Sequence, residues 1–341
     1  MNRLFVTGGA GFIGSAFIRL VLAENPSCVI TDFDALTYAG NLDNLEGIDT
    51  ERHRFVRGDI TDHDAVRAAL EEGTDAIVNF AAESHVDRSI ASADEFLCTN
   101  ILGTQVLLDA ARAKGVPRFV QVSTDEVMGS LPEDDNAFFT EASPYEPNSP
   151  YSASKAAAEH LVRAAHHTFG LDTVITRCGN NYGPRQFPEK LIPLLISNAL
   201  RDESIPVYGD GRNVRDWIYV DDHCRAVLGV MQQGRSGEVY NIGARNERRN
   251  IEVVESILTA LGKPLSLIRY VKDRLGHDRR YAIDPTRIET ELGWQPQETW
   301  ESGLSKTIKW YQENGAWVER ARSGAYREFY EQQYGEPINS Q

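Results

Sequence analysis

Short runs of consecutive apolar residues alternate with segments of helical periodicity through the first half of the chain. Continuous apolar runs indicate strands that are buried on both faces, as in a parallel sheet covered by helices. The predicted strands are Arg3–Thr7, Cys28–Asp32, Arg54–Arg57, Ala76–Phe80, Arg118–Ser123 and Thr173–Arg177. The helices between them are predicted near Phe12–Glu24, His63–Glu71, Asp94–Lys114 and Ser152–Phe169. Because such crossovers are right-handed, the pattern predicts an α/β fold with a Rossmann-type, doubly wound parallel sheet.

The regular alternation ends after about Asn180, where several prolines interrupt the chain. We therefore predict a sheet domain over residues 1–180 and a smaller, mixed α/β C-terminal lobe that takes up most of residues 181–341. A late strand at Val239–Ile242 predicts that residues from about 217 to 245 return to the sheet domain. The last residues, Gly335–Gln341, are predicted to form a loose tail.

The chain of 341 residues has a net charge of −15 and is 41% hydrophobic and 25% charged. The acidic balance argues against binding to nucleic acid or to an anionic membrane. No apolar run approaches the ~20 residues that span a bilayer, and the chain enters a strand at once, without a signal peptide. The cysteines are far apart, lack metal-ligand spacing and are typical of reduced thiols: Cys28, Cys98, Cys178 and Cys224. We therefore expect a cytoplasmic protein without a metal site.

The sequence VTGGAGFIGS lies between the first strand and the first helix and carries Gly8, Gly11 and Gly14. Glycines at these places allow a tight turn, close approach of a pyrophosphate to the backbone, and packing of the helix on the strand. The free N–H groups of the helix then face the phosphates. Since the motif follows a strand and opens a helix, it predicts a dinucleotide-binding site.

An acidic residue at the end of the second strand binds the ribose hydroxyls and repels a 2′-phosphate, which favours NAD over NADP. The sequence TDFDALTYAGN offers both Asp32 and Asp34 for this role, and the spacing does not choose between them. After the third strand, Asp59 is expected to contact the adenine or to cap the next helix.

Tyr151 and Lys155 in YSASK are four residues apart at a helix start and therefore lie on one face. A phenol has a pKa near 10 and needs a shift of roughly three units to act as a base at neutral pH. We expect the neighbouring ammonium and the cationic nicotinamide ring to lower it.

The sequence VSTDEVMGS places Thr124, Asp125 and Glu126 where a buried strand ends. Ligands of open α/β sheets bind at this edge, so the two carboxyl groups are candidates for acid–base chemistry. The alternative is that they only cap the next turn. Adjacent carboxyl groups in a pocket tend to share one proton, with pKa values that are pushed apart.

Together with Tyr-x-x-x-Lys, the glycine motif resembles the extended short-chain dehydrogenase/reductase superfamily. Within it, the chain resembles the dTDP-glucose 4,6-dehydratases from about residue 2 to residue 310. The motifs that carry this resemblance are LTYAGNL, NFAAESHVDRSI, STDEV, NNYGP, FPEKLIPL, NVRDWIYVDDH and GHDRRYAID.

The resemblance implies conversion of dTDP-glucose to dTDP-4-keto-6-deoxyglucose and water, with NAD tightly bound and regenerated in each turnover. It implies that Tyr151 takes the proton of O4 while C4 gives its hydride to NAD, with Lys155 beside it and Thr124 bonded to O4. It implies that Glu126 removes the C5 proton and that Asp125 protonates the leaving C6 hydroxyl. The hydride then returns to C6, and a proton returns to C5.

The resemblance also implies the binding residues, and here it selects Asp34 over Asp32. The cofactor would contact, besides Tyr151 and Lys155, Gly8, Gly11, Phe12, Ile13, Gly14, Asp34, Ala35, Leu36, Thr37, Asp59, Ile60, Phe80, Ala81, Ala82, Ser84, Thr99 and Asn181. The substrate would contact, besides Thr124, Asp125 and Glu126, Ser84, Asn180, Glu189, Lys190, Leu191, Pro206, Tyr208, Arg215, Asn250, His277, Asp278, Arg279 and Tyr281. Lys190, Arg215 and Arg279 would supply local positive charge.

Three positions depart from the family pattern: Met128 replaces a common tyrosine, Gly179 a common serine and Arg185 a common aromatic residue. We therefore ask whether the packing of the pocket and the contacts near the substrate lobe differ from those of the family. The polar residues around Ser84 are expected to shape their loop, without a catalytic role for His85: Glu83, His85, Asp87 and Arg88.

The resemblance further implies a homodimer, in which the helices near Asp94–Lys114 and Ser152–Phe169 pair with their symmetry mates as a four-helix bundle. A nucleotide-sugar 4-epimerase is the nearest alternative, and the adjacent carboxyl groups argue against it. A non-catalytic NAD-binding regulator is a further alternative, which would not need Tyr151 and Lys155. The sequence leaves open the choice of thymidine or uridine, the deoxysugar pathway, and whether NAD copurifies.

Overall fold

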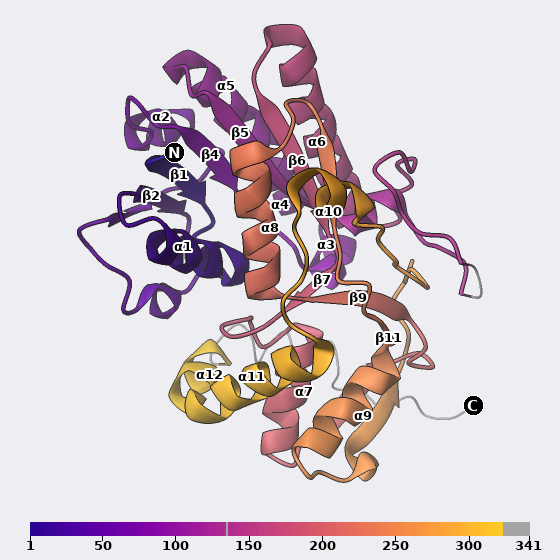
Figure 1. The fold of residues 1–341 in the computed structure, drawn as a ribbon. Helices are drawn as coiled ribbons and strands as arrows, with labels where there is room; N and C mark the ends of the chain where they lie inside the picture. The colour runs from indigo at the N-terminus through magenta and orange to yellow at the C-terminus, as the bar shows by residue number, and fades with distance from the viewer. Residues whose placement is uncertain (134–135, 323–341) are drawn as a thin grey trace.

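Seven parallel strands form the central sheet of the computed structural model, which describes residues 1–133 and 136–322 (Figure 1). The strand order is β10-β6-β5-β4-β1-β2-β3, which is the Rossmann order with one strand added at the β6 edge. The strands are β1 (Arg3–Thr7), β2 (Val29–Asp34), β3 (His53–Arg57), β4 (Ala76–Asn79), β5 (Arg118–Thr124), β6 (Thr173–Cys178) and β10 (Val239–Ile242). The six predicted strands and the returning strand at Val239–Ile242 are therefore confirmed.

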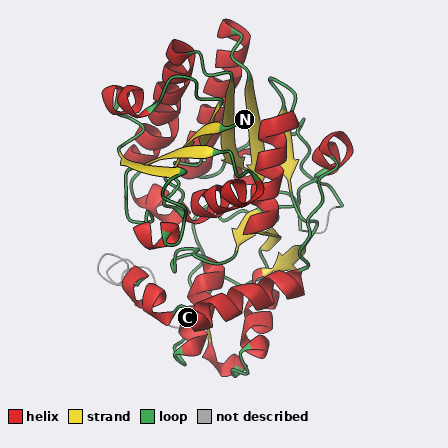
Figure 2. Cartoon of the chain, turned by 60° about the vertical axis from the view of Figure 1, so that its left-hand side comes forward, coloured by secondary structure: helices red, strands yellow, loops and turns green. Residues whose placement is uncertain are grey.

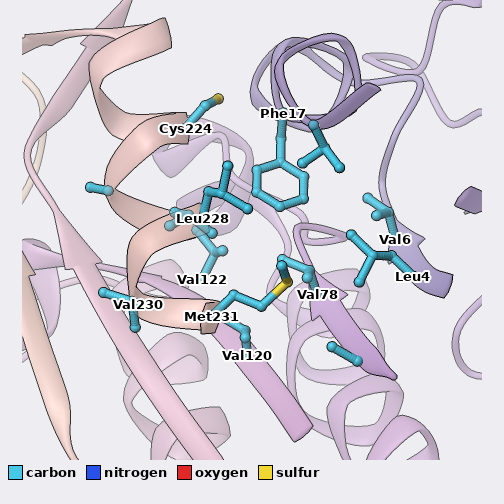
Figure 3. Close-up of a cluster of buried hydrophobic side chains, with 14 of the residues drawn as sticks. Leu4, Val6, Phe17, Val78, Val120, Val122, Cys224, Leu228, Val230 and Met231 are labelled. Atoms are coloured by element: carbon cyan, nitrogen blue, oxygen red, sulfur yellow. The ribbon is translucent and has the colours of Figure 1, made fainter. Parts of the chain in front are cut away.

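Both faces of this sheet are buried, as the continuous apolar runs predicted. On one face, Leu4 and Val6 of β1 pack with helices α1 (Phe12–Glu24) and α8 (Val220–Gln233), and Figure 3 shows this cluster. On the other face, Phe5 packs in a cluster built by α2 (His63–Ala69), α5 (Thr104–Lys114) and α6 (Pro150–Phe169). The alternation of Leu4, Phe5 and Val6 between two apolar layers fixes the register of the strand.

The helix predicted over Asp94–Lys114 is divided into three parts. It begins as α4 (Asp94–Phe96), continues as the π-helical turn η2 (Leu97–Gly103) and ends as α5. A Cβ at Gly103 would lie 2.5 Å from the Ile60 side chain, so this helix approaches the sheet domain closely. The short helix α3 (Val86–Ala91) precedes it.

The second part of the molecule lies below the carboxyl ends of the strands in Figure 1 and is mostly helical in Figure 2. A three-stranded sheet in the order β11-β9-β7 and a parallel pair β12-β8 belong to it. Its strands are β7 (Asn180–Tyr182), β8 (Ile205–Tyr208), β9 (Val214–Tyr219), β11 (Glu247–Arg249) and β12 (Ile268–Val271). Its helices are α7 (Leu191–Leu200), α9 (Asn250–Ala260), α11 (Trp300–Glu313) and α12 (Gly315–Ala321).

An aromatic core holds this second part together, and it includes Trp217, Trp300 and Trp317. By contrast, α10 (Thr286–Leu292) turns back, so that Ile288 and the following Trp294 join the core between the sheet, α1 and α8. The predicted tail, Gly335–Gln341, lies outside the described residues. Within residues 1–133 and 136–322, no helix is long and apolar enough to cross a membrane, and no group of three His, Cys, Asp or Glu could hold a metal ion.

Candidate active site

The glycine loop between β1 and α1 is as tight as its sequence predicted. Gly8 has φ +72°, and a Cβ there would lie 2.7 Å from the backbone nitrogen of Ala81. A Cβ on Gly14 would lie 2.2 Å from the carbonyl oxygen of Gly8, which brings the helix directly onto the turn. Gly11 is the N-cap of α1, whose first turn contains no acidic side chain. The residues therefore fit a pyrophosphate at the helix N-terminus.

The structure distinguishes the two aspartates of β2. Asp34 lines the cavity beside the glycine loop and accepts hydrogen bonds from the backbone nitrogens of Ala10 (3.0 Å) and Leu36 (2.8 Å). Asp32 is fully buried behind the loop, where a Cβ on Gly9 would collide with its carboxyl group. Only Asp34 can therefore reach a ribose in this cavity.

Asp59 also lines this cavity, and it does not cap the next helix. Its carboxylate accepts hydrogen bonds from the backbone nitrogen and the hydroxyl of Thr61, each at 2.8 Å. The N-cap of α2 is Asp62, which accepts from the backbone nitrogens of the first turn. The capping alternative for Asp59 is therefore wrong.

The cavity, of about 320 Å³, runs from the glycine loop across the carboxyl ends of β4 and β5. It brings together every predicted cofactor residue except Leu36, which has φ +54° and touches the site through its hydrogen bond to Asp34. The lining residues from the prediction are Gly8, Gly11, Phe12, Ile13, Gly14, Asp34, Ala35, Thr37, Asp59, Ile60, Phe80, Ala81, Ala82, Ser84, Thr99, Tyr151, Lys155 and Asn181.

Tyr151 and Lys155 lie on the first turns of α6, which begins two residues earlier than predicted. Ser149 and Ser152 form a capping box there, and Pro150 occupies the first helical position. Lys155 Nζ donates a hydrogen bond of 2.8 Å to the carbonyl oxygen of Val122 at the end of β5. The serine box and this bond fix the helix against the strand that carries the two carboxyl groups.

Burial dominates the pKa of Tyr151 in the structure. Burial, with Glu126 next in importance, raises that pKa well above its ordinary value, and a hydrogen bond with Thr124 opposes the effect. Burial also lowers the pKa of Lys155 to about 8. The phenol therefore needs nearby positive charge to ionise, which Lys155 and a cationic nicotinamide ring would supply.

Asp125 and Glu126 differ in their electrostatic surroundings. Burial and the neighbouring Glu126 raise the pKa of Asp125 well above its usual range, and Asp125 Oδ2 has no hydrogen-bond partner among the residues that the structure describes. Burial also raises the pKa of Glu126, but three cations oppose the rise: Arg215, Arg274 and Lys190. Glu126 therefore ionises first and Asp125 keeps the shared proton.

Thr124 connects these groups at the end of β5. Its Oγ1 accepts a hydrogen bond of 3.3 Å from the backbone nitrogen of Glu126 and donates one of 3.2 Å to Asp125 Oδ1. The carboxyl residues do start a short 3₁₀ helix, η3 (Asp125–Met128), but Thr124 is its cap. The alternative that Asp125 and Glu126 only cap the next turn is therefore wrong.

A second cavity opens between the sheet domain and the C-terminal part. Five residues line both cavities: Ser84, Glu126, Asn180, Glu189 and Lys190. The other predicted substrate residues at this second cavity are Leu191, Pro206, Tyr208, Arg215, Asn250, His277, Asp278 and Tyr281, whereas Thr124 and Asp125 face the first. Since the cavities meet at Glu126, one ligand can extend from the carboxyl pair into the second cavity.

Arg279 is not brought to either cavity. Its guanidinium pairs with Glu133 (2.8 Å) and Asp210 (2.9 Å) near the surface. The predicted positive charge comes instead from Arg274, which lines the second cavity and which the sequence analysis missed. Asp87 orients Arg274 through two hydrogen bonds, of 2.6 and 2.9 Å. No local sequence signal separates the two arginines, because their different partners come from distant segments.

The polar residues around Ser84 connect the two parts of the molecule. Besides Arg274, Asp87 accepts a hydrogen bond of 3.3 Å from the hydroxyl of Tyr208. Lys190 Nζ donates one of 2.8 Å to the carbonyl oxygen of Ser84. Burial lowers the pKa of His85 well below its ordinary value. These contacts support the expected structural role of the cluster and make His85 a neutral side chain.

The three departures from the family pattern have separate explanations. Met128 is buried in an apolar cluster with Val127, Phe139, Ala156 and Tyr281. Gly179 lies so close to β9 that a Cβ would be 2.7 Å from the carbonyl oxygen of Asp216. The Arg185 guanidinium lies 5.4 Å from the ring centre of Trp310 on α11 and lines neither cavity.

The fold and the site define the class of this protein, a dinucleotide-dependent enzyme of the extended short-chain dehydrogenase/reductase type. A family model described as GDP-mannose 4,6 dehydratase matches residues 5–307, and the chain belongs to this family.

Individual relatives are similar over nearly their whole length. The chain is 50% identical to a dTDP-glucose 4,6-dehydratase of Shigella flexneri, over 97% of this chain and 99% of that protein. It is 52% identical to one of Xanthomonas campestris, over 96% of this chain and 98% of that protein. The crystal structure of DesIV, a dTDP-glucose 4,6-dehydratase of Streptomyces venezuelae with NAD and TYD bound, superposes with a TM-score of 0.91. DesIV is 53% identical, and the match covers 94% of this chain and 99% of DesIV.

Proposed function

We propose that this chain is an NAD-dependent dTDP-glucose 4,6-dehydratase, which converts dTDP-glucose to dTDP-4-keto-6-deoxyglucose and water. The observation that carries the proposal is the pair of buried Asp125 and half-buried Glu126, whose pKa values are raised to different extents, beside Tyr151 in one cavity. An epimerase has no need of such a pair, and its reaction would leave the C6 hydroxyl in place. The relatives of about 50% identity support the same activity.

Tyr151 and Thr124 would act on O4 of the sugar. The phenolate of Tyr151 takes the O4 proton, and the Thr124 hydroxyl holds the oxygen in line. NAD, when bound, accepts the hydride of C4 and returns it to C6. Lys155, whose pKa is about 8, is mostly an ammonium at neutral pH and, in addition to its bond to Val122, can donate to the cofactor ribose.

The carboxyl pair would perform the elimination. Once C4 is a ketone, the proton on C5 is acidic, and Glu126 is the group that ionises first. Asp125 retains a proton and gives it to the C6 hydroxyl as that group leaves. Glu126 then returns its proton to C5 as the hydride reaches C6. Each residue thus has the protonation state that its step requires, and the difference comes from the cations placed around Glu126.

The second cavity would bind the nucleoside diphosphate. Lys190, Arg215 and Arg274 line it and offer positive charge, while Pro206 and Tyr208 offer an apolar wall for the base. These cations suit a diphosphate in a protein whose net charge is −15.

Arg274→Ala is expected to raise the KM for dTDP-glucose by about 10–100-fold, because charge-assisted hydrogen bonds are worth about 1.5–3 kcal/mol. Arg279→Ala removes the same charge from the same segment, but its partners are Glu133 and Asp210 rather than a cavity wall. Its KM is expected to stay within about twofold of the wild type, as for other exposed ion pairs. Initial-rate kinetics of the two variants measure both KM values. A larger rise in KM for Arg279→Ala than for Arg274→Ala would show that Arg279 binds the substrate.

Incubation with dTDP-glucose deuterated at C4 tests the function. Mass spectrometry and NMR of the product are expected to show the loss of one water and deuterium at C6. Formation of dTDP-galactose would instead establish a 4-epimerase. No turnover of dTDP-, UDP- or GDP-glucose with added NAD would favour a non-catalytic NAD-binding protein.

We also propose a homodimer and a cytoplasmic location. Apolar side chains are exposed along α3, η2 and the end of α6, and a four-helix interface would bury them: Ile90, Leu97, Leu102 and Phe169. Sedimentation velocity tests the dimer, since a monomer at all concentrations contradicts it.

All four cysteines are free, which supports a reducing compartment and thus the cytoplasmic location. Detection of the protein in an extracellular fraction contradicts this location.

A further inference from the structure

The loop between β2 and β3 crosses the dinucleotide cavity before it reaches the surface. In its first part, Ala35, Thr37, Tyr38, Ala39 and Gly40 line that cavity. The ring of Tyr38 packs edge-on against Phe187 at 5.7 Å, and the Arg88 guanidinium lies 3.8 Å from the Tyr38 ring centre. A dinucleotide in the cavity would therefore contact both this loop and the glycine loop.

Asn44 binds this crossing loop to the glycine loop from behind. It is 1% exposed and belongs to the 3₁₀ helix η1 (Leu42–Leu45). Its Nδ2 donates a hydrogen bond of 2.9 Å to the carbonyl oxygen of Ala10, between Gly8 and Gly11. The backbone nitrogen of Asn41 donates to the same oxygen at 3.0 Å. The far end of the loop is thus attached to the peptide that forms the phosphate turn.

The other end of the Asn44 amide is held by the C-terminal part of the molecule. Trp317 of α12 donates a hydrogen bond of 3.1 Å from its indole Nε1 to Asn44 Oδ1, and its side chain is buried. Beside it, Arg320 pairs with Asp43 at 2.8 Å. Trp317 is fixed in turn by edge-on contacts with Trp310 at 5.1 Å and Tyr311 at 6.3 Å.

We propose that Asn44 and Trp317 form a latch that retains NAD, so that α12 controls the opening of the loop over the cofactor. The amide of Asn44 is a positioning group: its oxygen is held by α12 and its nitrogen holds the glycine loop. Neither side chain lines the cavity, so they act through the loops and not on the dinucleotide itself. The proposal rests on the proposed function only in taking NAD as the bound dinucleotide.

The rate of NAD dissociation tests the latch. The full-length enzyme is loaded with radiolabelled NAD and diluted into excess unlabelled NAD, and the retained label is followed with time. Asn44→Ala, which removes both hydrogen bonds, is expected to release NAD about 10–100-fold faster, and Trp317→Phe, which removes one, about 5–10-fold faster. Association is expected to change less, because the cavity wall is unchanged.

Trp294→Phe is the matched control. It also removes a buried indole donor, since Trp294 Nε1 donates to the carbonyl oxygen of Asp222 on α8, and not to the crossing loop, at 3.2 Å. The latch requires fast NAD release in Trp317→Phe and wild-type release in Trp294→Phe at comparable thermal stability. Equal rates of NAD release in the wild type, Trp317→Phe and Trp294→Phe overturn the latch. Equal acceleration of release in the two tryptophan variants overturns it as well. If Asn44→Ala does not fold, the tryptophan pair decides alone. If the wild-type protein binds no NAD, both the latch and the proposed function are contradicted. If the wild type binds NAD and the release rates are equal, only the latch is contradicted.

Discussion

Replacing Tyr151 with phenylalanine is expected to lower kcat by about 10³–10⁴-fold, at the upper end of what a positioned acid–base group contributes. The first step needs a base at O4, and no other side chain on α6 reaches the cavity there except Lys155, which donates to Val122. Steady-state product formation measures the loss. Binding of dTDP, measured by calorimetry, is expected to stay unchanged because Tyr151 does not line the second cavity.

Tyr145→Phe is the control for this prediction. The Tyr145 hydroxyl donates a hydrogen bond of 2.9 Å to Glu159 on α6, the helix that carries Tyr151. Tyr145 lines neither cavity. The same chemical change there is expected to reduce stability by about 1 kcal/mol and to leave kcat within about twofold, since general acid–base catalysis needs direct reach to the reacting proton. A Tyr151→Phe enzyme that keeps a tenth of the wild-type rate would contradict the role of the phenol.

Much of the sheet domain could be predicted from the sequence because its signals are local. Each strand is an apolar run, and the glycine loop, the Tyr-x-x-x-Lys pair and the carboxyl pair each lie within one short segment. The π-helical turn at Leu97–Gly103 could not be predicted, since its seven residues are too few to show a period different from that of the flanking α-helices.

The distinctions that local spacing could not make depend on contacts between distant segments. Asp32 and Asp34 are equivalent by spacing, and only the packing of Gly9 on Asp32 separates them. Arg274 and Arg279 are five positions apart, and their roles follow from Asp87, Glu133 and Asp210, which come from elsewhere in the chain.

The surroundings of Tyr151 also depend on distant contacts. The four-residue spacing predicts that Lys155 shares its helix face, but the direction of the ammonium depends on a carbonyl in β5. The contact between Asn44 and Trp317 joins residues 273 positions apart and has no sequence signal at all.

Asp125→Asn and Glu126→Gln are each expected to lower the rate of dehydration by about 10²–10⁴-fold, and for different reasons. Asparagine cannot protonate the C6 hydroxyl, and glutamine cannot remove the C5 proton. Both amides are close in size to the carboxyl groups that they replace, so the packing around η3 is retained. The rate with dTDP-glucose therefore does not distinguish the general acid from the general base. A substrate with a different leaving group on C6 distinguishes them.

The separating experiment uses dTDP-6-deoxy-6-fluoroglucose, in which fluoride leaves C6 with little need for a proton. Asp125→Asn is expected to recover most of its lost rate with this substrate, and Glu126→Gln is expected to stay inactive. Rescue of Glu126→Gln alone would reverse the assignment of acid and base, and rescue of neither would remove the elimination role from Asp125.

The pH dependence gives an independent check on the same division. Burial raises the pKa of both carboxyl groups, and the cations near Glu126 keep its pKa below that of Asp125. Activity needs Glu126 ionised, so it falls as the pH drops through the Glu126 pKa. It also needs Asp125 protonated, so it falls again as the pH rises through the Asp125 pKa. With the fluoro substrate, Asp125→Asn is expected to lose the fall on the basic side that belongs to Asp125 and to keep the fall on the acidic side, because only Glu126 still titrates in the pair.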